Sequence, residues 1–103
     1  MGYVYLIKED EENGRYKIGS TRKKNIEERL KELQTGNSSK LIIADSFETE
    51  KPFKLEGMLH RHYASDNELN EWFNLDDDKI KGFKDVCNKY QTIIESLKNN
   101  PFF

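Results

Sequence analysis

The segment YVYLIKEDEENGRYKIG, from Tyr3 to Gly19, sets the architecture of the chain. Its first part, Tyr3 to Lys8, is rich in aromatic and β-branched residues, which favour a strand. Its middle, Glu9 to Gly14, is a polar turn that ends in Asn-Gly, a dipeptide typical of tight hairpins. Arg15 to Gly19 reads as the returning strand. The segment therefore predicts an N-terminal β-hairpin.

A helix follows the hairpin. Asn25 is a suitable N-cap, because its side-chain oxygen can accept from a free backbone N–H group of the first turn. Ile26, Leu30 and Leu33 then recur at i, i+4 and i+7, which places them on one helical face. Gly36 is a suitable residue to end the helix. We therefore predict a helix between Asn25 and Gly36.

The rest of the chain predicts a strand at Leu41 to Phe47, a helix after Pro52, and a short apolar piece at Glu71 to Leu75 that closes onto the core. A long C-terminal helix is predicted over about residues 78–98, with the motif-bearing core at residues 2–75. The expected fold class is α+β, with a small three-stranded antiparallel sheet flanked by helices. The expected order is strand, strand, helix, strand, helix, helix, within one domain covering residues 1–103.

Composition supports a folded protein. The chain has 103 residues and 12% aromatic residues, which argues against disorder. One cysteine, Cys87, excludes an intramolecular disulfide and a Cys-rich zinc site. We see no signal peptide and no apolar run long enough to span a membrane. We therefore expect an intracellular, cytoplasmic protein without a membrane partner.

Charge is distributed unevenly along the chain. The net charge is −2, yet residues 17–31 hold six basic residues against Glu27 and Glu28. A local basic surface can attract phosphate on an acidic protein, because fields act over short distances in salt. The residues predicted to bind nucleic acid through this surface are Arg22, Lys23, Lys24 and Lys31.

The order of short motifs resembles the GIY-YIG nuclease superfamily. The matching segments, in chain order, are Tyr3-Val4-Tyr5, Lys17-Ile18-Gly19 followed by Ser20-Thr21, Glu28-Arg29-Leu30, Leu33 to Gly36, Leu55 to His60, and Glu71-Trp72-Phe73. This order is similar to the phage- and virus-associated branch, whose members also favour a lysine in the second motif. Two positions depart from the superfamily pattern: Tyr3 replaces the leading glycine, and Lys17 replaces a tyrosine.

The resemblance implies catalytic roles for several residues. Tyr5 would work with the attacking water, and Lys17 in the facing strand would supply the positive charge that a phenol of pKa near 10 needs to act as a base. Arg29 would bind phosphate oxygens through its planar guanidinium. Without the resemblance, Tyr5 also fits an ordinary cross-strand aromatic, and Arg29 a solvated helix charge.

The resemblance also implies a metal site. Glu56 would bind one divalent ion, Mg²⁺ or Mn²⁺, because a carboxylate with waters and a substrate phosphate is a normal magnesium site. His60 lies one helical turn further on and would contact phosphate, relay a proton, or bond to a neighbouring carboxylate. The alternative for Glu56 is a plain surface glutamate.

The predicted function is a metal-dependent endonuclease that hydrolyses phosphodiester bonds, with DNA more expected than RNA as partner. Tyr5, Lys17, Arg29 and Glu56 are then expected to meet on one concave surface of the sheet. Two alternatives remain: a non-catalytic nucleic-acid-binding module on the same fold, and a protein-interaction module whose basic surface meets an acidic partner.

Overall fold

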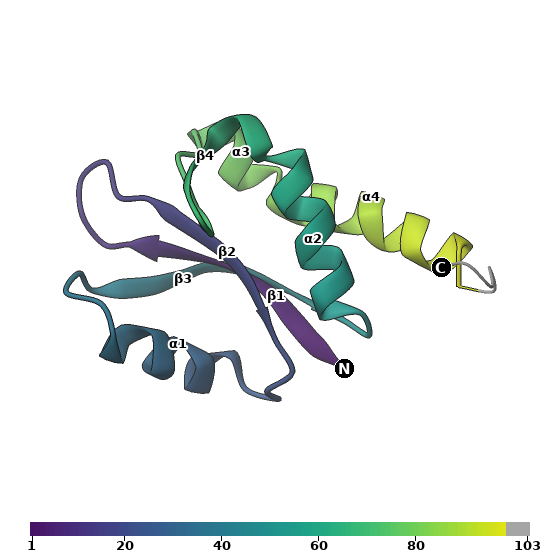
Figure 1. Cartoon of the computed structure of the whole chain (residues 1–103), viewed down its shortest axis with the longest axis horizontal. Coiled ribbons are helices and arrows are strands. Elements are labelled where there is room, and N and C mark those ends of the chain that lie inside the picture. Colours follow the sequence, from purple (N-terminus) through teal and green to yellow (C-terminus); the bar gives the residue numbers. More distant parts are fainter. Residues whose placement is uncertain (99–103) are drawn as a thin grey trace.

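A computed structural model describes residues 1–98 of the chain. Its antiparallel sheet contains β1 (Gly2–Glu9), β2 (Tyr16–Thr21), β3 (Leu41–Thr49), β4 (Asn67–Leu69) and β5 (Trp72–Phe73). The strands lie in the order β3-β1-β2-β5-β4, so β1 is flanked by β2 and β3 (Figure 1). The predicted α+β class and N-terminal hairpin are confirmed.

The expected number of strands was wrong. The sheet has five strands rather than three, because residues 67–73 form a small hairpin that adds β5 and β4 beside β2. Asn70 occupies its turn with φ of 54°, a left-handed conformation that asparagine tolerates. Phe73 is nevertheless 1% exposed, so the apolar piece does close onto the core as predicted.

Strand register divides the hairpin residues between the two faces of the sheet. Tyr5 lies opposite Gly19, and Ile7 lies opposite Lys17, so these four residues share one face. Val4, Leu6 and Ile18 belong to the other face. Each face has its own apolar cluster, and β1 contributes to both of them.

Helices cover both faces (Figure 1). On the Tyr5 face lies α1 (Ile26–Thr35), which begins as predicted at Asn25, where the side chain accepts from the Glu27 N–H at 2.9 Å. On the other face lie α2 (Pro52–His62) and α4 (Phe83–Ser96). A 3₁₀ turn (Ala64–Asp66) follows α2. Among residues 1–98, no helix has the length and apolar character needed to cross a membrane.

The predicted C-terminal helix is two helices. A short α3 (Asp77–Lys81) precedes α4, and the two meet at Gly82. Glycine is a poor helix former, and here it separates the two segments even though the apolar stripe continues on both sides of it. The stripe still packs as expected, because Phe83, Cys87 and Ile94 are buried in the core. Residues 99–103 of the predicted domain lie outside the described part.

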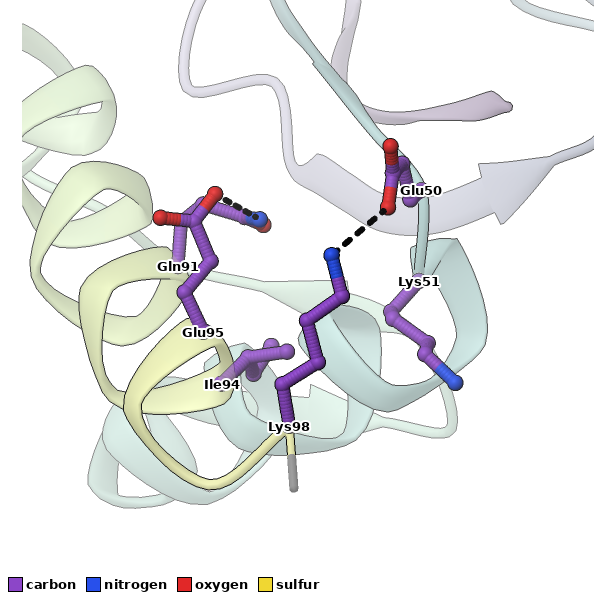
Figure 2. Close-up of a pocket in the computed structure, with 6 residues that line it drawn as sticks. All are labelled: Glu50, Lys51, Gln91, Ile94, Glu95 and Lys98. Carbon is purple, nitrogen blue, oxygen red and sulfur yellow. Dashed lines mark hydrogen bonds and ion pairs between the residues drawn. The ribbon is translucent and has the colours of Figure 1, made fainter.

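The last turns of α4 pack beside the junction of β3 and α2. Thr49 at the end of β3 donates to Gln91 at 2.7 Å. A small pocket lies at this junction (Figure 2), lined by Glu50, Lys51, Gln91, Ile94, Glu95 and Lys98. Across it, Nζ of Lys98 lies 3.9 Å from the carboxylate of Glu50. The pocket therefore marks where α4 is anchored to the sheet.

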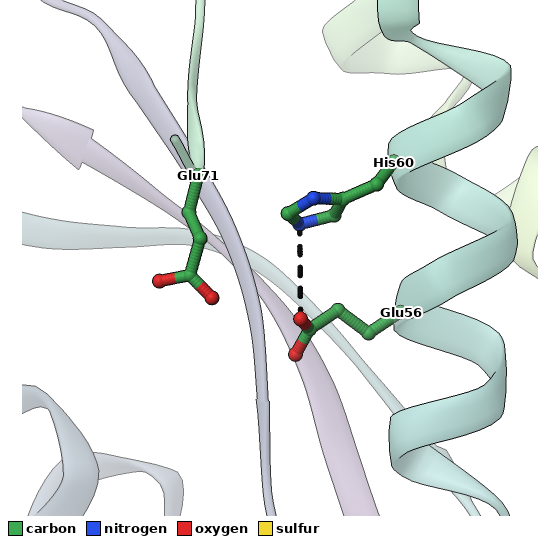
Figure 3. Close-up of side chains that lie close together, drawn as sticks. All are labelled: Glu56, His60 and Glu71. Carbon is green, nitrogen blue, oxygen red and sulfur yellow. Dashed lines mark ion pairs between the residues drawn. The ribbon is translucent and has the colours of Figure 1, made fainter. Parts of the chain in front are cut away.

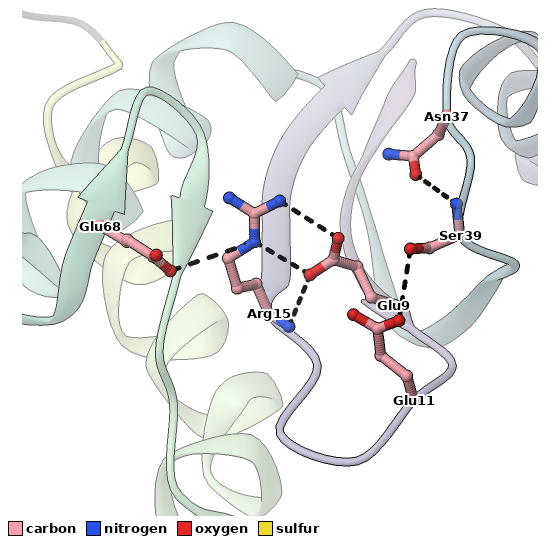
Figure 4. Close-up of polar contacts among 6 residues, drawn as sticks. All are labelled: Glu9, Glu11, Arg15, Asn37, Ser39 and Glu68. Atoms are coloured by element: carbon pink, nitrogen blue, oxygen red, sulfur yellow. Dashed lines mark hydrogen bonds and ion pairs between the residues drawn. The ribbon is translucent and has the colours of Figure 1, made fainter.

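One buried carboxylate joins the two sides of the hairpin turn. Glu9, at the end of β1, is 5% exposed and accepts three hydrogen bonds from Arg15, at 2.9, 2.9 and 3.2 Å (Figure 4). These hydrogen bonds hold the pKa of Glu9 below its usual value, even though burial acts in the opposite direction. Both the charge and the geometry of this carboxylate therefore support the folded hairpin.

Glu9→Gln should lower the free energy of unfolding by about 1–3 kcal/mol near neutral pH, the usual range for charge-assisted hydrogen bonds. The carboxylate pKa is depressed in the folded state, so its stabilisation is present above the unfolded pKa near 4.3 and is lost as pH falls through the folded value. The difference between the two proteins should therefore shrink below about pH 4. Urea unfolding followed by circular dichroism from pH 3 to 7 measures this. Glu12→Gln, in the same turn but exposed, is the matched control. A difference that persists unchanged at pH 3 would contradict the assignment.

Candidate functional site

The candidate site lies along one edge of β2. Strand β5 pairs with Tyr16 and Lys17 of β2, and the N–H of Ile18 donates to the carbonyl of Glu71 at 3.1 Å. Within residues 1–98, no strand pairs with β2 beyond this point on that side. We call residues 18–21 on this side the open edge of β2.

Helix α2 supplies side chains to the open edge. The hydroxyl of Ser20 donates to Oε1 of Glu56 at 2.5 Å. Nε2 of His60 lies 2.8 Å from the carbonyl oxygen of Ile18. A carbonyl oxygen can only accept, so Nε2 is the donor of this hydrogen bond. Glu56 and His60 are therefore fixed against β2 by hydrogen bonds to neighbouring positions of the strand.

A second carboxylate completes a cluster with these two residues. Glu71, from the turn between β4 and β5, points toward Glu56 and His60 (Figure 3). One potential ligand atom from each of the three lies within 4.8 Å of the other two, and all three side chains are partly buried. Nε2 of His60 is 3.8 Å from Glu56. Two carboxylates and an imidazole thus face one small volume.

Tyr5 reaches the same strand from the other face. A Cβ atom added to Gly19 would lie 2.4 Å from the Tyr5 hydroxyl oxygen, so the ring passes directly over this glycine. The hydroxyl accepts from Nε of Arg29 on α1 at 3.4 Å. Tyr5 is 1% exposed overall, whereas the Arg29 side chain keeps 34% of its surface. The guanidinium is therefore the more accessible member of this pair.

The surroundings of Tyr5 act on the pKa of its phenol in opposite directions, with a net rise. Burial raises the pKa of the phenol, more than the hydrogen bond and charge of Arg29 lower it, and Glu71 and Glu56 raise it further. The phenol therefore keeps its proton near neutral pH.

Lys17 has a different partner from the one predicted. Its Nζ forms an ion pair with Glu71 at 2.9 Å and lies 5.2 Å from the ring centre of Trp72. It lies on the Tyr5 face, as expected from the register, but Arg29 is the cation that bonds to the phenol. Lys17 instead holds Glu71 near the open edge.

The expectation of a single concave surface was wrong in one respect. Tyr5, Lys17 and Arg29 belong to the α1 face, whereas α2, which carries Glu56, covers the opposite face. The two groups approach each other because the open edge lacks a covering strand. The candidate residues therefore lie along the edge of β2. Some approach this edge from the α1 face of the sheet and the others from the α2 face.

The remaining predicted residues are exposed on or near the loop that leads into α1. Arg22, Lys23 and Lys24 follow β2 directly, and Lys31 is exposed on α1. Lys23 lies 3.6 Å from Glu32. The loop residues line a pocket together with Met1, Tyr3 and Glu48. This loop forms a basic surface at the end of β2.

Sequence reasoning missed Ser20 and Glu71 as site residues. A signal for Glu71 existed in the sequence, because Lys17 is a charged residue in a strand beside apolar positions and requires a partner of opposite charge. Ser20 gave no comparable signal, since a serine after a glycine reads as an ordinary turn residue.

The fold and the cluster define a small α+β domain with carboxylates and a guanidinium at an open strand edge. The family model of the T5orf172 domain matches residues 2–90, and the chain belongs to this family. The T5orf172 domain is found in phage and related proteins and is associated with nuclease-like folds. No curated protein and no solved structure matches the chain significantly.

Proposed function

We propose that the chain is a metal-dependent endonuclease of the GIY-YIG type that hydrolyses phosphodiester bonds, in DNA rather than RNA. The observation that carries the proposal is the cluster of Glu56, His60 and Glu71 beside the Tyr5–Arg29 pair. Phosphodiester hydrolysis needs a group that orients water, a group that binds phosphate, and a positive charge that stabilises the leaving oxygen. The open edge of β2 offers residues suited to each.

The donor set fits a divalent cation. Mg²⁺ and Mn²⁺ prefer oxygen ligands, and the potential ligand atoms of the cluster lie within 4.8 Å of one another, near enough to face one ion. Glu56 and Glu71 would hold the ion. Nε2 of His60 lies 3.8 Å from Glu56 and is already bonded to the carbonyl of Ile18, so His60 would stand beside the ion and position Glu56 rather than bind the ion itself. When bound, such an ion polarises a phosphoryl oxygen and stabilises negative charge on the leaving oxygen.

Residues of the chain would carry the remaining roles, which are phosphate binding and the positioning of other side chains. Arg29, whose Nη1 lies 3.4 Å from Glu32, would bind phosphate oxygens in place of that carboxylate, a contact for which its fork geometry is suited. Tyr5 keeps its proton and, because it is buried, acts through Arg29: its hydroxyl accepts from Nε of Arg29 and positions the guanidinium. Lys17 and Ser20 position the carboxylates of Glu71 and Glu56.

Plasmid nicking tests the proposal. Purified protein should convert supercoiled plasmid to the open circle in Mg²⁺ or Mn²⁺ and should be inactive in EDTA. A parallel titration of labelled DNA at several salt concentrations measures phosphate binding, since affinity falls with salt as counterions are released. Salt-dependent binding without metal-dependent nicking would favour the non-catalytic nucleic-acid module. The absence of both would favour a protein-interaction module.

A further inference from the structure

The side of α2 that carries Glu56 and His60 also carries one further residue, Phe53, nearer the start of the helix. Phe53, Glu56 and His60 of α2 recur at i, i+3 and i+7, so they lie on one side of the helix. Each of the three contacts a different residue, either in β2 or directly after it. His60 meets Ile18, Glu56 meets Ser20, and Phe53 meets Arg22. The helix stripe and the open edge of β2 therefore run side by side.

Phe53 is unusual among the apolar residues of α2, because 58% of its surface is exposed. The guanidinium of Arg22 lies 5.1 Å from its ring centre, which is within range of a cation–π contact. Within residues 1–98, Arg22 forms no ion pair. An aromatic face and an unneutralised guanidinium thus remain open to solvent together.

The position and the charge indicate what occupies this surface. Arg22 is followed by the exposed Lys23 and Lys24, so the surroundings suit a polyanion rather than an apolar protein partner. Phe53 lies three residues before Glu56, about 4.5 Å along the helix axis at 1.5 Å per residue. That spacing suits a base in the nucleotide next to a phosphate held at the cluster. Aromatic rings bind any base face, provided the base is not stacked in a duplex.

We propose that Phe53 and Arg22 form a stacking site for an unpaired base beside the scissile phosphate. The preferred substrate is then single-stranded or locally unpaired DNA, such as a flap, branch or mismatch. This inference rests on the proposed nuclease function for the identity of the neighbouring phosphate. The stacking itself requires only that the protein binds nucleic acid.

Binding in EDTA, where no cleavage is expected, tests the stacking site. The probes are a fluorescein-labelled 12-nucleotide oligothymidylate, the same strand with abasic nucleotides in its central positions, and a hairpin whose bases are all paired because a non-nucleotide linker closes it. Phe53→Leu should weaken binding to the oligothymidylate about tenfold, as expected for one base stacked on an aromatic ring. Binding to the hairpin should change less than twofold. The abasic strand should bind wild type and variant equally, because the base that Phe53 contacts is absent.

Leu69→Ala is the matched control, because Leu69 is 59% exposed on β4, away from the basic loop. Circular dichroism checks folding of both variants. Equal effects of Phe53→Leu on all three probes, or no effect on any, would overturn the stacking site. So would a wild-type dimer, seen by light scattering, that Phe53→Leu dissociates, since a second copy would then cover the ring. Phe53-dependent binding without nicking keeps the stacking site and removes the nuclease, whereas nicking without Phe53 dependence does the reverse.

Discussion

Glu56→Gln should reduce metal-dependent plasmid nicking by about 10³-fold, because the several kcal/mol that a bound divalent ion contributes to charge stabilisation would be lost. Glutamine keeps the length of the side chain and an oxygen that can accept from Ser20, so the fold and the contact with β2 should survive. The measurement is the initial nicking rate in saturating Mn²⁺, with a calorimetric titration of Mn²⁺ alone as a second readout.

Glu68→Gln is the control for this variant. Glu68 is an exposed glutamate of β4 whose nearest cation, Arg15, lies 4.0 Å away, so removing its charge should alter the rate little. Glu71→Gln should fall between the two, since it removes one proposed ligand and leaves Glu56. If Glu56→Gln nicks at the wild-type rate and binds Mn²⁺ normally, the cluster is not the metal site.

Gly19→Ala should damage both stability and activity. The new Cβ atom would lie 2.4 Å from the hydroxyl oxygen of Tyr5 and 2.6 Å from Cζ, so the buried ring must move. Overpacking of this kind costs about 1–3 kcal/mol of unfolding free energy. A shift of about 1 Å at a positioning group costs about 10²-fold in rate, so nicking should fall by that factor at temperatures where the variant is still folded.

Gly57→Ala provides the matched glycine control. A Cβ atom at Gly57 would find its nearest neighbour, the end of the Arg61 side chain, at 3.7 Å, which is ordinary contact. Alanine favours a helix over glycine by about 1 kcal/mol, so this variant should be slightly more stable and fully active. Urea unfolding and nicking rates measured on both variants separate the two cases. Wild-type activity in Gly19→Ala would show that the position of Tyr5 does not matter to the reaction.

The hairpin, the first helix and the two faces of the sheet followed from local patterns. Alternation in Tyr3 to Lys8 placed Tyr5 and Ile7 on one face, and the hairpin register brings Lys17 to that face, as the hypothesis required. Asn25 began its helix for a purely local reason, the hydrogen bond to Glu27. Such features depend on residues close in sequence and can be deduced without knowledge of the rest of the fold.

The features that were missed depend on distant or weakly patterned residues. Strands β4 and β5 are three and two residues long, too short to show alternation, and all of β4 is exposed. Gly82 divides the last helix although the apolar stripe continues past it. The raised pKa of Tyr5 follows from burial beneath α1, which the sequence of the strand does not reveal.

The open edge of β2 also couples ligand binding to folding. Contacts there join residues far apart in the chain: Tyr5 and Arg29 are 24 residues apart, Ser20 and Glu56 are 36, and Ile18 and His60 are 42. Each contact exists only after a long loop has closed, which costs conformational entropy. A cation or phosphate that binds across this edge binds the folded chain and not the unfolded one. Binding of such a ligand therefore raises the free energy of unfolding. At ligand concentrations above the dissociation constant, this increase grows with the logarithm of the ligand concentration. The stability of the domain would thus depend on whether a ligand is bound at the open edge of β2.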